Sequence, residues 1–205
     1  MTKTLLITGA AKRLGRAIAL DLAEAGWTIG LHYHGSAVEA EETARDIRAK
    51  GGKVALFAAD FAKEEDIAGL IPRVTGEIGP LTALINSASL FENDDWKSAS
   101  RQSWDAHMQT NLRAPFLLSQ IFAKQRPKGE AGNIINIVDQ RVLKPTPQFM
   151  SYSLSKAGLY WLTTTLAQAL APTIRVNAVG PGPTLRNVRQ SEEDFDRQRK
   201  ATVLG

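Results

Sequence analysis

Six short apolar runs alternate with longer stretches whose apolar residues recur at helical spacing, and this alternation constrains the fold more than any other feature. The runs have the length of β-strands, and Ile, Val and Leu occupy both odd and even positions, as in parallel strands buried on both faces. Consecutive parallel strands need a crossover, usually a helix. The sequence therefore predicts a doubly wound parallel α/β sheet with helices on both faces. The predicted strands are Thr4–Thr8, Thr28–Tyr33, Lys53–Ala58, Leu81–Asn86, Asn133–Val138 and Ile174–Val179.

The segments between these strands predict five helices. Ser36 and Glu39 form a capping-box pattern at the start of the second helix, and Pro115 should bend the fourth. The strongly charged stretch Arg189–Lys200 is either a surface helix or a mobile flap. We expect one domain over residues 1–205, with a substrate loop at about residues 183–200. The predicted helices are Leu14–Ala25, Ser36 to Gly51, a segment marked by Ile67 to Ile78, Arg101–Lys124 and Phe149–Leu170.

Composition excludes several classes of protein. The 205 residues contain no cysteine, which excludes disulfides and cysteine-ligated zinc and fits a reducing, cytoplasmic location. No stretch approaches the roughly 20 apolar residues of a membrane span. The net charge is +4, but basic and acidic residues are interleaved and form no stripe for nucleic acid. We expect a small-molecule ligand, with no metal centre, nucleic acid or membrane as partner.

A glycine-containing turn follows the first predicted strand. Gly9 allows the chain to leave the strand sharply, and Gly15 lets the next helix approach the sheet closely. The free N–H groups and dipole of a helix that begins near Leu14 favour a pyrophosphate. Lys12 and Arg13 add positive charge, and Arg13 takes the place of a middle glycine, from which it can reach the cofactor or the substrate. The motif predicts a Rossmann-type dinucleotide site; the alternative is an ordinary strand-to-helix turn.

The end of the second strand indicates which nucleotide binds. An NAD site usually has a carboxylate there for the ribose 2′-hydroxyl, and this chain has none. His34, the Ser36 hydroxyl and N–H, and Lys12 could accept a 2′-phosphate, which favours NADP(H), and His32 is a further candidate for the cofactor site. The alternative for the two histidines is a strand end with two surface side chains. Asp60, after the third strand, could accept the adenine amino group or cap a helix.

Tyr152 and Lys156 lie one helical turn apart, on the same face of the predicted helix. A phenol with a pKa of ~10 needs a neighbour that favours its anion before it can act as an acid–base group near neutral pH. A lysine ammonium one turn away provides this by Coulomb attraction. The pair is a candidate proton-transfer site; the alternative is a half-buried tyrosine beside a solvated lysine.

In combination and order, these motifs resemble the short-chain dehydrogenase/reductase superfamily from Thr8 to Thr184, and its pteridine reductase branch most closely. The resemblance implies a nicotinamide cofactor, Tyr152 as proton donor, and Lys156 holding the nicotinamide ribose. It also implies that Asn111 holds a water linking Lys156 to solvent. Further cofactor-binding positions implied by the resemblance are Asp60, Phe61, Asn86, Ser87, Ala88, Pro181 and Gly182.

Asp139 is the main departure from the superfamily pattern. Most members carry serine there, whereas the pteridine reductase branch resembles this chain in using aspartate. A carboxylate beside a phenol raises the phenol's pKa, which suits proton donation during reduction. It also accepts hydrogen bonds from the N–H groups of a pterin. Phe91 either stacks on such a flat substrate or packs against the core, and Asp139 could alternatively mark an inactive site.

Three functions remain open from the sequence. The first is an NADPH-dependent reductase of a pteridine or dihydropteridine; the second is a carbonyl reductase of a ketone or 3-oxoacyl substrate. The third is a catalytically silent NADP(H)-binding sensor. The resemblance implies a homo-oligomer, tetramer or dimer, and Trp96, Trp104 and Trp161 are interpreted as packing or subunit-interface residues. The superfamily's final helix and strand are not recognisable, so we expect the sheet to end at the sixth strand with an unpaired edge.

Overall fold

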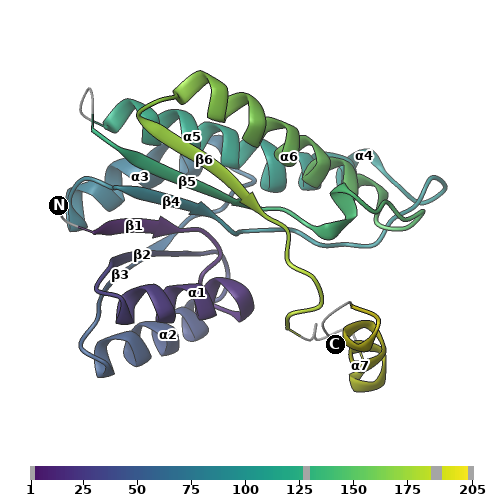
Figure 1. Cartoon of the computed structure of the whole chain (residues 1–205), viewed down its shortest axis with the longest axis horizontal. Helices are drawn as coiled ribbons and strands as arrows, with labels where there is room; N and C mark the ends of the chain where they lie inside the picture. Colours follow the sequence, from purple (N-terminus) through teal and green to yellow (C-terminus); the bar gives the residue numbers. More distant parts are fainter. Residues whose placement is uncertain (1–2, 127–129, 186–190, 203–205) are drawn as a thin grey trace.

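The computed structural model describes residues 3–126, 130–185 and 191–202. Six strands form one parallel sheet in the order β3-β2-β1-β4-β5-β6. The order reverses direction between β1 and β4, and the chain segments that leave these two strands diverge there (Figure 1). This confirms the doubly wound parallel sheet. The strands are β1 (Thr4–Ile7), β2 (Thr28–Tyr33), β3 (Lys53–Ala58), β4 (Ala83–Asn86), β5 (Gly132–Ile137) and β6 (Ile174–Val179).

Helices cover the two faces of the sheet in two groups (Figure 1). On one face, α1 and α2 bury Ala19 and Ile47 against Leu5 and Ile29. On the other face, α3, α5 and α6 pack over a core that contains the fully buried Phe122. The helices are α1 (Arg13–Glu24), α2 (Ala37–Ala49), α3 (Glu64–Ile78), α4 (Arg101–Met108), α5 (Ala114–Gln125), α6 (Met150–Leu170) and α7 (Glu192–Lys200).

The last strand, β6, is covered on one face only. Ile174 and Val176 are buried, but Arg175 and Asn177, which point to the opposite face, are exposed, and Val179 is half exposed. The strand therefore alternates buried and exposed residues, the pattern of a strand with one open face. Among the described residues, β6 also forms an outer edge of the sheet.

The fourth predicted helix is interrupted. A π-helical turn, η1 (Gln109–Arg113), separates α4 from α5, and the N–H of Ala114 donates to Gln109 O five residues earlier. Pro115 follows at once and has no N–H to donate to the carbonyl of Asn111, four residues before it. The predicted bend therefore takes the form of a wide turn just before the proline, and this turn contains Asn111.

The predicted capping box at α2 is wrong. Ser36 precedes the helix, but its side chain accepts no capping hydrogen bond. The carboxylate of Glu39 instead forms an ion pair of 2.5 Å with Lys12, which lies in the turn after β1. The opposite charge of Lys12 thus outcompetes the backbone N–H that a capping-box glutamate would accept from.

The charged C-terminal stretch forms the surface helix α7, which buries none of its residues. Ser191 caps it by accepting a hydrogen bond from the N–H of Asp194. The predicted start at Arg189 lies outside the described residues. Within the described ranges, no helix has both the length and the apolar character needed to cross a bilayer.

Candidate active site

The glycine turn after β1 is closed by contacts that leave no room for side chains. Gly9 has a φ of +66°, and a Cβ there would lie 2.7 Å from the Cα of Ala88. A Cβ on Gly15 would lie 2.3 Å from the carbonyl oxygen of Gly9. Arg16 donates to the carbonyl of Lys12, so the helical N–H groups before Arg16 have no partner within the helix. This close-packed turn fits the approach of a pyrophosphate to the backbone.

His32 supports this turn from inside the protein. Its ring is 2% exposed, and its Nδ1 accepts a hydrogen bond of 3.1 Å from the N–H of Gly9. The ring proton therefore lies on Nε2, which donates to the carbonyl of Ala59 at 3.1 Å. Burial lowers the pKa of His32 to about 4, so the ring is neutral. Phe61 stacks on it with 4.3 Å between ring centroids.

The two histidines at the end of β2 therefore differ. The alternative of two surface side chains is wrong for His32, because both its ring nitrogens bond the backbone. His34 is 67% exposed, and its Nε2 lies 3.8 Å from a carboxylate oxygen of Asp60. Asp60 also accepts from the N–H of Ala62 at 3.0 Å, so it organises the turn before α3. His34, Ser36 and Lys12 lie at the rim, with Lys12 paired to Glu39.

Arg13 adopts a backbone conformation that is rare for an arginine. Its φ is +50°, in the left-handed region that favours glycine. Its side chain is exposed, and Nη2 lies 3.4 Å from the carbonyl oxygen of Leu185 in the segment after β6. Its charge lowers the pKa of Tyr152 slightly, which places Arg13 within electrostatic range of the tyrosine.

The ends of β1 and β4 are joined by Thr8, whose hydroxyl oxygen accepts from the N–H groups of Ser87 and Ala88 at 2.9 and 3.0 Å. Asn86 is buried and donates through Nδ2 to Asn136 Oδ1 on β5 at 2.8 Å. These bonds hold together three strand ends at the point where the strand order reverses.

Tyr152 and Asp139 are in direct contact at the end of β5. The Tyr152 hydroxyl donates to Asp139 Oδ2 over 2.8 Å. Burial and the adjacent carboxylate of Asp139 raise the pKa of Tyr152 well above its usual value. The tyrosine therefore keeps its proton across the physiological pH range. The rise of its pKa is in the direction expected when aspartate takes the place of serine at position 139.

Lys156 is buried one turn after Tyr152 in α6. Its ammonium donates to the carbonyl of Ile137 at 2.8 Å and lies 5.9 Å from the centre of the Tyr152 ring. Burial lowers the pKa of Lys156 to about 8, although the charge of Asp139 opposes this shift. Burial and Asp139 raise the pKa of Tyr152, and the cations that oppose this shift are Arg141 and Arg13 rather than the expected Lys156.

Arg141 belongs to this site and was missed in the sequence. Its backbone N–H donates to Asp139 Oδ1 at 2.8 Å. Its guanidinium donates to both carboxylate oxygens of Asp139 at 3.3 Å. It lies on a short 3₁₀ turn, η2 (Gln140–Val142), that starts immediately after Asp139. An arginine two residues after an expected catalytic carboxylate was a usable signal, because the turn brings the two side chains together.

Phe91 stacks on Phe149, with the ring centroids 4.5 Å apart and the rings nearly parallel. Phe91 also meets the Tyr152 ring edge-on at 4.7 Å. The Arg141 guanidinium carbon lies 5.6 Å from the Phe91 centroid and 5.1 Å from that of Phe149. Since it is near both rings, the guanidinium lies beside the stack rather than beyond one end. Phe149 was not recognised as a site residue, because only its left-handed φ of +56° brings it there.

Asn111 is buried in the π-helical turn η1. Its Oδ1 accepts from the N–H of Leu90 at 2.8 Å, and its Nδ2 donates to Leu90 O and to Ser155 Oγ. The side chain therefore fastens the segment after β4 to α6, and these contacts do not include Lys156. The role of Asn111 in holding a water remains a prediction.

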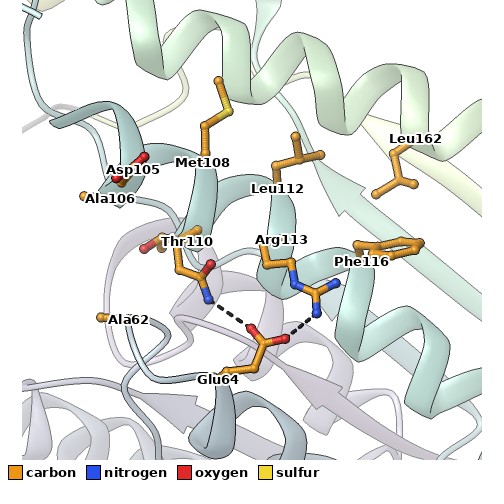
Figure 2. A pocket seen from close by; sticks show the side chains of 11 residues that line it. Ala62, Glu64, Asp105, Ala106, Met108, Thr110, Leu112, Arg113, Phe116 and Leu162 are labelled. Carbon is orange, nitrogen blue, oxygen red and sulfur yellow. Dashed lines mark hydrogen bonds and ion pairs between the residues drawn. The ribbon is translucent and has the colours of Figure 1, made fainter. Parts of the chain in front are cut away.

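Two further features complete the surroundings. Pro181 and Gly182 lie in the segment after β6, where Gly182 O accepts from the N–H of Thr184. A depression of about 910 Å³ is lined by residues of α4, η1 and α5 (Figure 2). Its base holds Glu64, which binds Arg113 and Gln109. Tyr152, Lys156 and Asp139 are not among the residues that line it.

Comparisons with known proteins identify the family of the chain. A profile of the family described as short chain dehydrogenase matches residues 3–197. The 3-oxoacyl-(acyl-carrier-protein) reductase FabG of Staphylococcus epidermidis is 35% identical over 183 residues, which cover 89% of this chain and 75% of the relative. The structure of FolM alternative dihydrofolate reductase 1 from Brucella canis, complexed with NADP, is 44% identical, with a TM-score of 0.93, and covers 98% of this chain and 80% of that one. A dehydrogenase/reductase from Sinorhizobium meliloti is 32% identical, with a TM-score of 0.91, over 100% of this chain and 82% of that one. The chain therefore belongs to the short-chain dehydrogenase/reductase family, as its motifs predicted, and is an oxidoreductase.

Proposed function

We propose that this protein is an NADPH-dependent reductase of a flat, nitrogen-rich heterocycle, with a pteridine or dihydropteridine as its substrate. The observation that carries the proposal is the hydrogen bond from the Tyr152 hydroxyl to Asp139. This pair combines a held proton with an acceptor carboxylate, which suits a substrate that needs a proton on nitrogen and presents N–H donors.

The preference for NADP(H) rests on the turn after β1 and on the side chains of Lys12 and His34 at the rim. Gly9, Gly15 and the first N–H groups of α1 would hold the pyrophosphate, and Lys12 and His34 would hold the 2′-phosphate. To bind the phosphate, Lys12 would have to leave its ion pair with Glu39. The lysine would then replace one anionic partner with another. The bound cofactor would supply a hydride. The FolM structures complexed with NADP support this assignment.

Tyr152 would act as the proton donor at its hydroxyl. Burial and Asp139 keep the phenol protonated, so the proton is available throughout the pH range in which the enzyme works. Asp139 would accept a hydrogen bond from a substrate N–H, and it would orient the substrate against the tyrosine. Lys156 would place its positive charge below the Tyr152 ring and stabilise the phenolate left after transfer.

Phe91 and Phe149 would supply the wall against which a flat substrate lies. They form a stacked aromatic pair in which Phe91 meets the Tyr152 ring at a steep angle, and Arg141 lies beside them. Asp139 and Arg141 together offer an acceptor and a donor side by side, a pattern that matches the mixed donor and acceptor edge of a pterin better than the single carbonyl of a ketone.

The test is NADPH oxidation with dihydrobiopterin, a quinone and a 3-ketoester in parallel, using the wild type and Tyr152→Phe. We expect dihydrobiopterin to be reduced with the highest kcat/KM and the variant to lose about 100-fold or more, the usual contribution of a general acid. Turnover of the 3-ketoester alone would contradict the substrate assignment. Tight NADPH binding without turnover of any of the three would support the silent sensor.

A carbonyl reductase is the second candidate, because FabG relatives reach 35% identity. The residue at position 139 discriminates between the pteridine reductase and the carbonyl reductase, since most members of the superfamily carry serine there and this chain carries aspartate. In the same assay, Asp139→Ser should lower dihydrobiopterin reduction and raise any activity on the 3-ketoester. If the wild type already prefers the 3-ketoester and Asp139→Ser changes nothing, the carbonyl reductase is the better assignment.

We also propose a cytoplasmic homo-oligomer, a dimer or tetramer. Large apolar side chains on and near α4 and α6 support this assembly: Trp96 is 75% exposed, Trp161 71% and Trp104 41%. The depression between α4 and α5 is bordered by Phe116 and Leu162 and presents further apolar surface (Figure 2). Light scattering of the purified protein measures the mass directly, and Trp161→Glu should lower it if α6 lies in the interface.

A further inference from the structure

The helix that carries Tyr152 is capped by another segment of the chain. Phe149, the residue before α6, has a left-handed backbone and offers no side-chain cap. Instead Asn93 Oδ1 accepts from the N–H of Phe149 at 3.3 Å, and the Asp94 carbonyl accepts from that of Met150 at 3.2 Å. The carboxylate of Asp94 accepts from the N–H of Ser151 at 3.0 Å. The first turn of α6 therefore depends on the segment that follows β4.

Three polar side chains behind this cap form a buried chain of hydrogen bonds. His107 and Ser151 are 0% exposed, and Asp94 is 3% exposed. The N–H of Glu92 donates to Nε2 of His107 at 3.2 Å, so the ring proton of His107 lies on Nδ1. That nitrogen donates to Ser151 Oγ at 2.7 Å, and Ser151 Oγ donates in turn to Asp94 Oδ2. Every bond in the chain has a defined donor and acceptor.

His107 thereby connects the neighbours of two site residues. Glu92 follows Phe91, the aromatic residue of the substrate wall, and Ser151 precedes Tyr152. The imidazole, from α4, bonds both neighbours, one with each ring nitrogen. Phe91 and Tyr152 meet edge-on at 4.7 Å, and the His107 ring itself lies 6.2 Å from the Tyr152 ring.

We propose that His107 is a positioning residue that sets the placement of Phe91 relative to Tyr152, acting through Glu92 on one side and Ser151 on the other. Its two nitrogens then have separable effects. The Nε2 bond holds the wall that binds the substrate, whereas the Nδ1 bond holds the start of the helix that carries the proton donor. The choice of substrate for the kinetic measurement rests on the proposed function.

Two conservative variants separate the two bonds. In His107→Asn, the amide nitrogen can take the place of Nδ1 and keep Ser151, but the bond from Glu92 is lost. In His107→Gln, the amide oxygen can take the place of Nε2 and keep Glu92, but the donor to Ser151 is lost. We expect His107→Asn to raise KM about five- to tenfold with kcat within about twofold, as the loss of one hydrogen bond predicts. His107→Gln should lower kcat about tenfold with KM within about twofold.

A buried hydroxyl elsewhere provides the control for general loss of stability. Ser119 is 1% exposed, and its hydroxyl donates to the Pro115 carbonyl within α5. Ser119→Ala should lower the melting temperature without changing kcat or KM. If the two His107 variants change kcat and KM by equal factors, His107 only stabilises the fold and the proposal is wrong.

Amide hydrogen exchange tests the same bonds without any substrate. The Glu92 amide should exchange faster in His107→Asn than in the wild type and keep its protection in His107→Gln. This measurement stays decisive if none of the candidate substrates is reduced, so failure of the proposed function is distinguishable from failure of this proposal. Unchanged Glu92 exchange in His107→Asn would overturn the assignment.

Discussion

The Tyr152 hydroxyl donates to a carboxylate oxygen of Asp139 at 2.8 Å, so the two groups that would act on the substrate are already bonded to each other. This contact and burial raise the pKa of Tyr152. Asp139→Asn removes the negative charge and should lower the tyrosine pKa toward its ordinary value. We expect kcat/KM for dihydrobiopterin to fall about 10- to 100-fold, because the substrate N–H loses a charged acceptor. Full activity of Asp139→Ala on every substrate that the wild type reduces would contradict the role assigned to Asp139.

Arg141 restrains Asp139 and also acts on the tyrosine. Its positive charge lowers the Tyr152 pKa against the larger effects of burial and Asp139. Arg141→Ala should therefore raise that pKa further and raise the KM for dihydrobiopterin about tenfold, because Asp139 loses its orienting partner. Arg141→Lys keeps the charge but loses the planar guanidinium. Measuring kcat and KM for both variants separates the two effects, since both lose the planar guanidinium that orients Asp139 and only Arg141→Ala loses the charge that acts on the tyrosine.

The buried Lys156 predicts two opposite dependences on pH. Its pKa is about 8, below the ordinary 10.5, so the ammonium loses its proton above pH 8 and reductase activity should fall there. Stability changes in the other direction. The folded protein binds fewer protons than the unfolded chain between pH 8 and 10.5, so this residue's contribution to stability rises with pH across that window.

Lys156→Met isolates this effect. The difference in unfolding free energy between wild type and variant should change by at most about 3 kcal/mol over that window. Denaturant titrations at several pH values measure it. A difference that is constant over that pH window would show that Lys156 is not desolvated in the folded protein.

His32 predicts a loss of stability in acid. Its pKa is about 4 in the folded protein against an ordinary 6.5, so the unfolded chain binds more protons between these values. Stability from His32 is therefore lost as the pH falls from 6.5 to 4, by at most about 3 kcal/mol. His32→Asn keeps an acceptor for the Gly9 N–H without titrating in this range. It should unfold with a flatter acid profile than the wild type, measured by denaturant titrations between pH 4 and 7.

Arg13 places a positively charged side chain on a strained backbone. Its φ of +50° costs a non-glycine residue about 1 kcal/mol. Arg13→Gly should raise the melting temperature relative to Arg13→Ala, because only glycine relieves the strain. Both variants lose the guanidinium and should raise the KM for NADPH by similar factors. Equal melting temperatures for the two would show that the backbone at Arg13 is not strained.

The strands around the site and the family of the chain could be predicted from the sequence, because both depend on patterns of residues that are close together in the chain. The bounds of β2, β3 and β6 agree with the predicted ranges, and the short-chain dehydrogenase/reductase family was identified from the glycine turn and the Tyr152–Lys156 spacing. The exposure of His32 could not be predicted, because burial depends on Phe61 and the Ala59 carbonyl, which come from another strand end.

The remaining misses have the same physical origin. Glu39 pairs with Lys12 rather than capping its own helix, since the competing cation lies in the turn after β1. Phe149 bonds Asn93, 56 positions earlier in the chain, and His107 bonds Ser151, 44 positions later. Contacts between residues so far apart cannot be predicted from local spacing in the sequence. Asp139 was recognised from the motif, and Arg141, two residues later, was a usable signal that was not followed, because the contact itself depends on the 3₁₀ turn that brings the two side chains together.

The capping of α6 from outside has a consequence for the order of folding. Phe149, the residue before Met150, has no side-chain atom that can accept from the first N–H groups of the helix. The start of the helix is defined only when Asn93 and Asp94 have docked against it. We expect the sheet and the glycine turn to form before the register of Tyr152 is set. Tyr152, the proposed proton donor, would then reach its final position among the last events of folding, after the turn proposed to bind the nucleotide has formed.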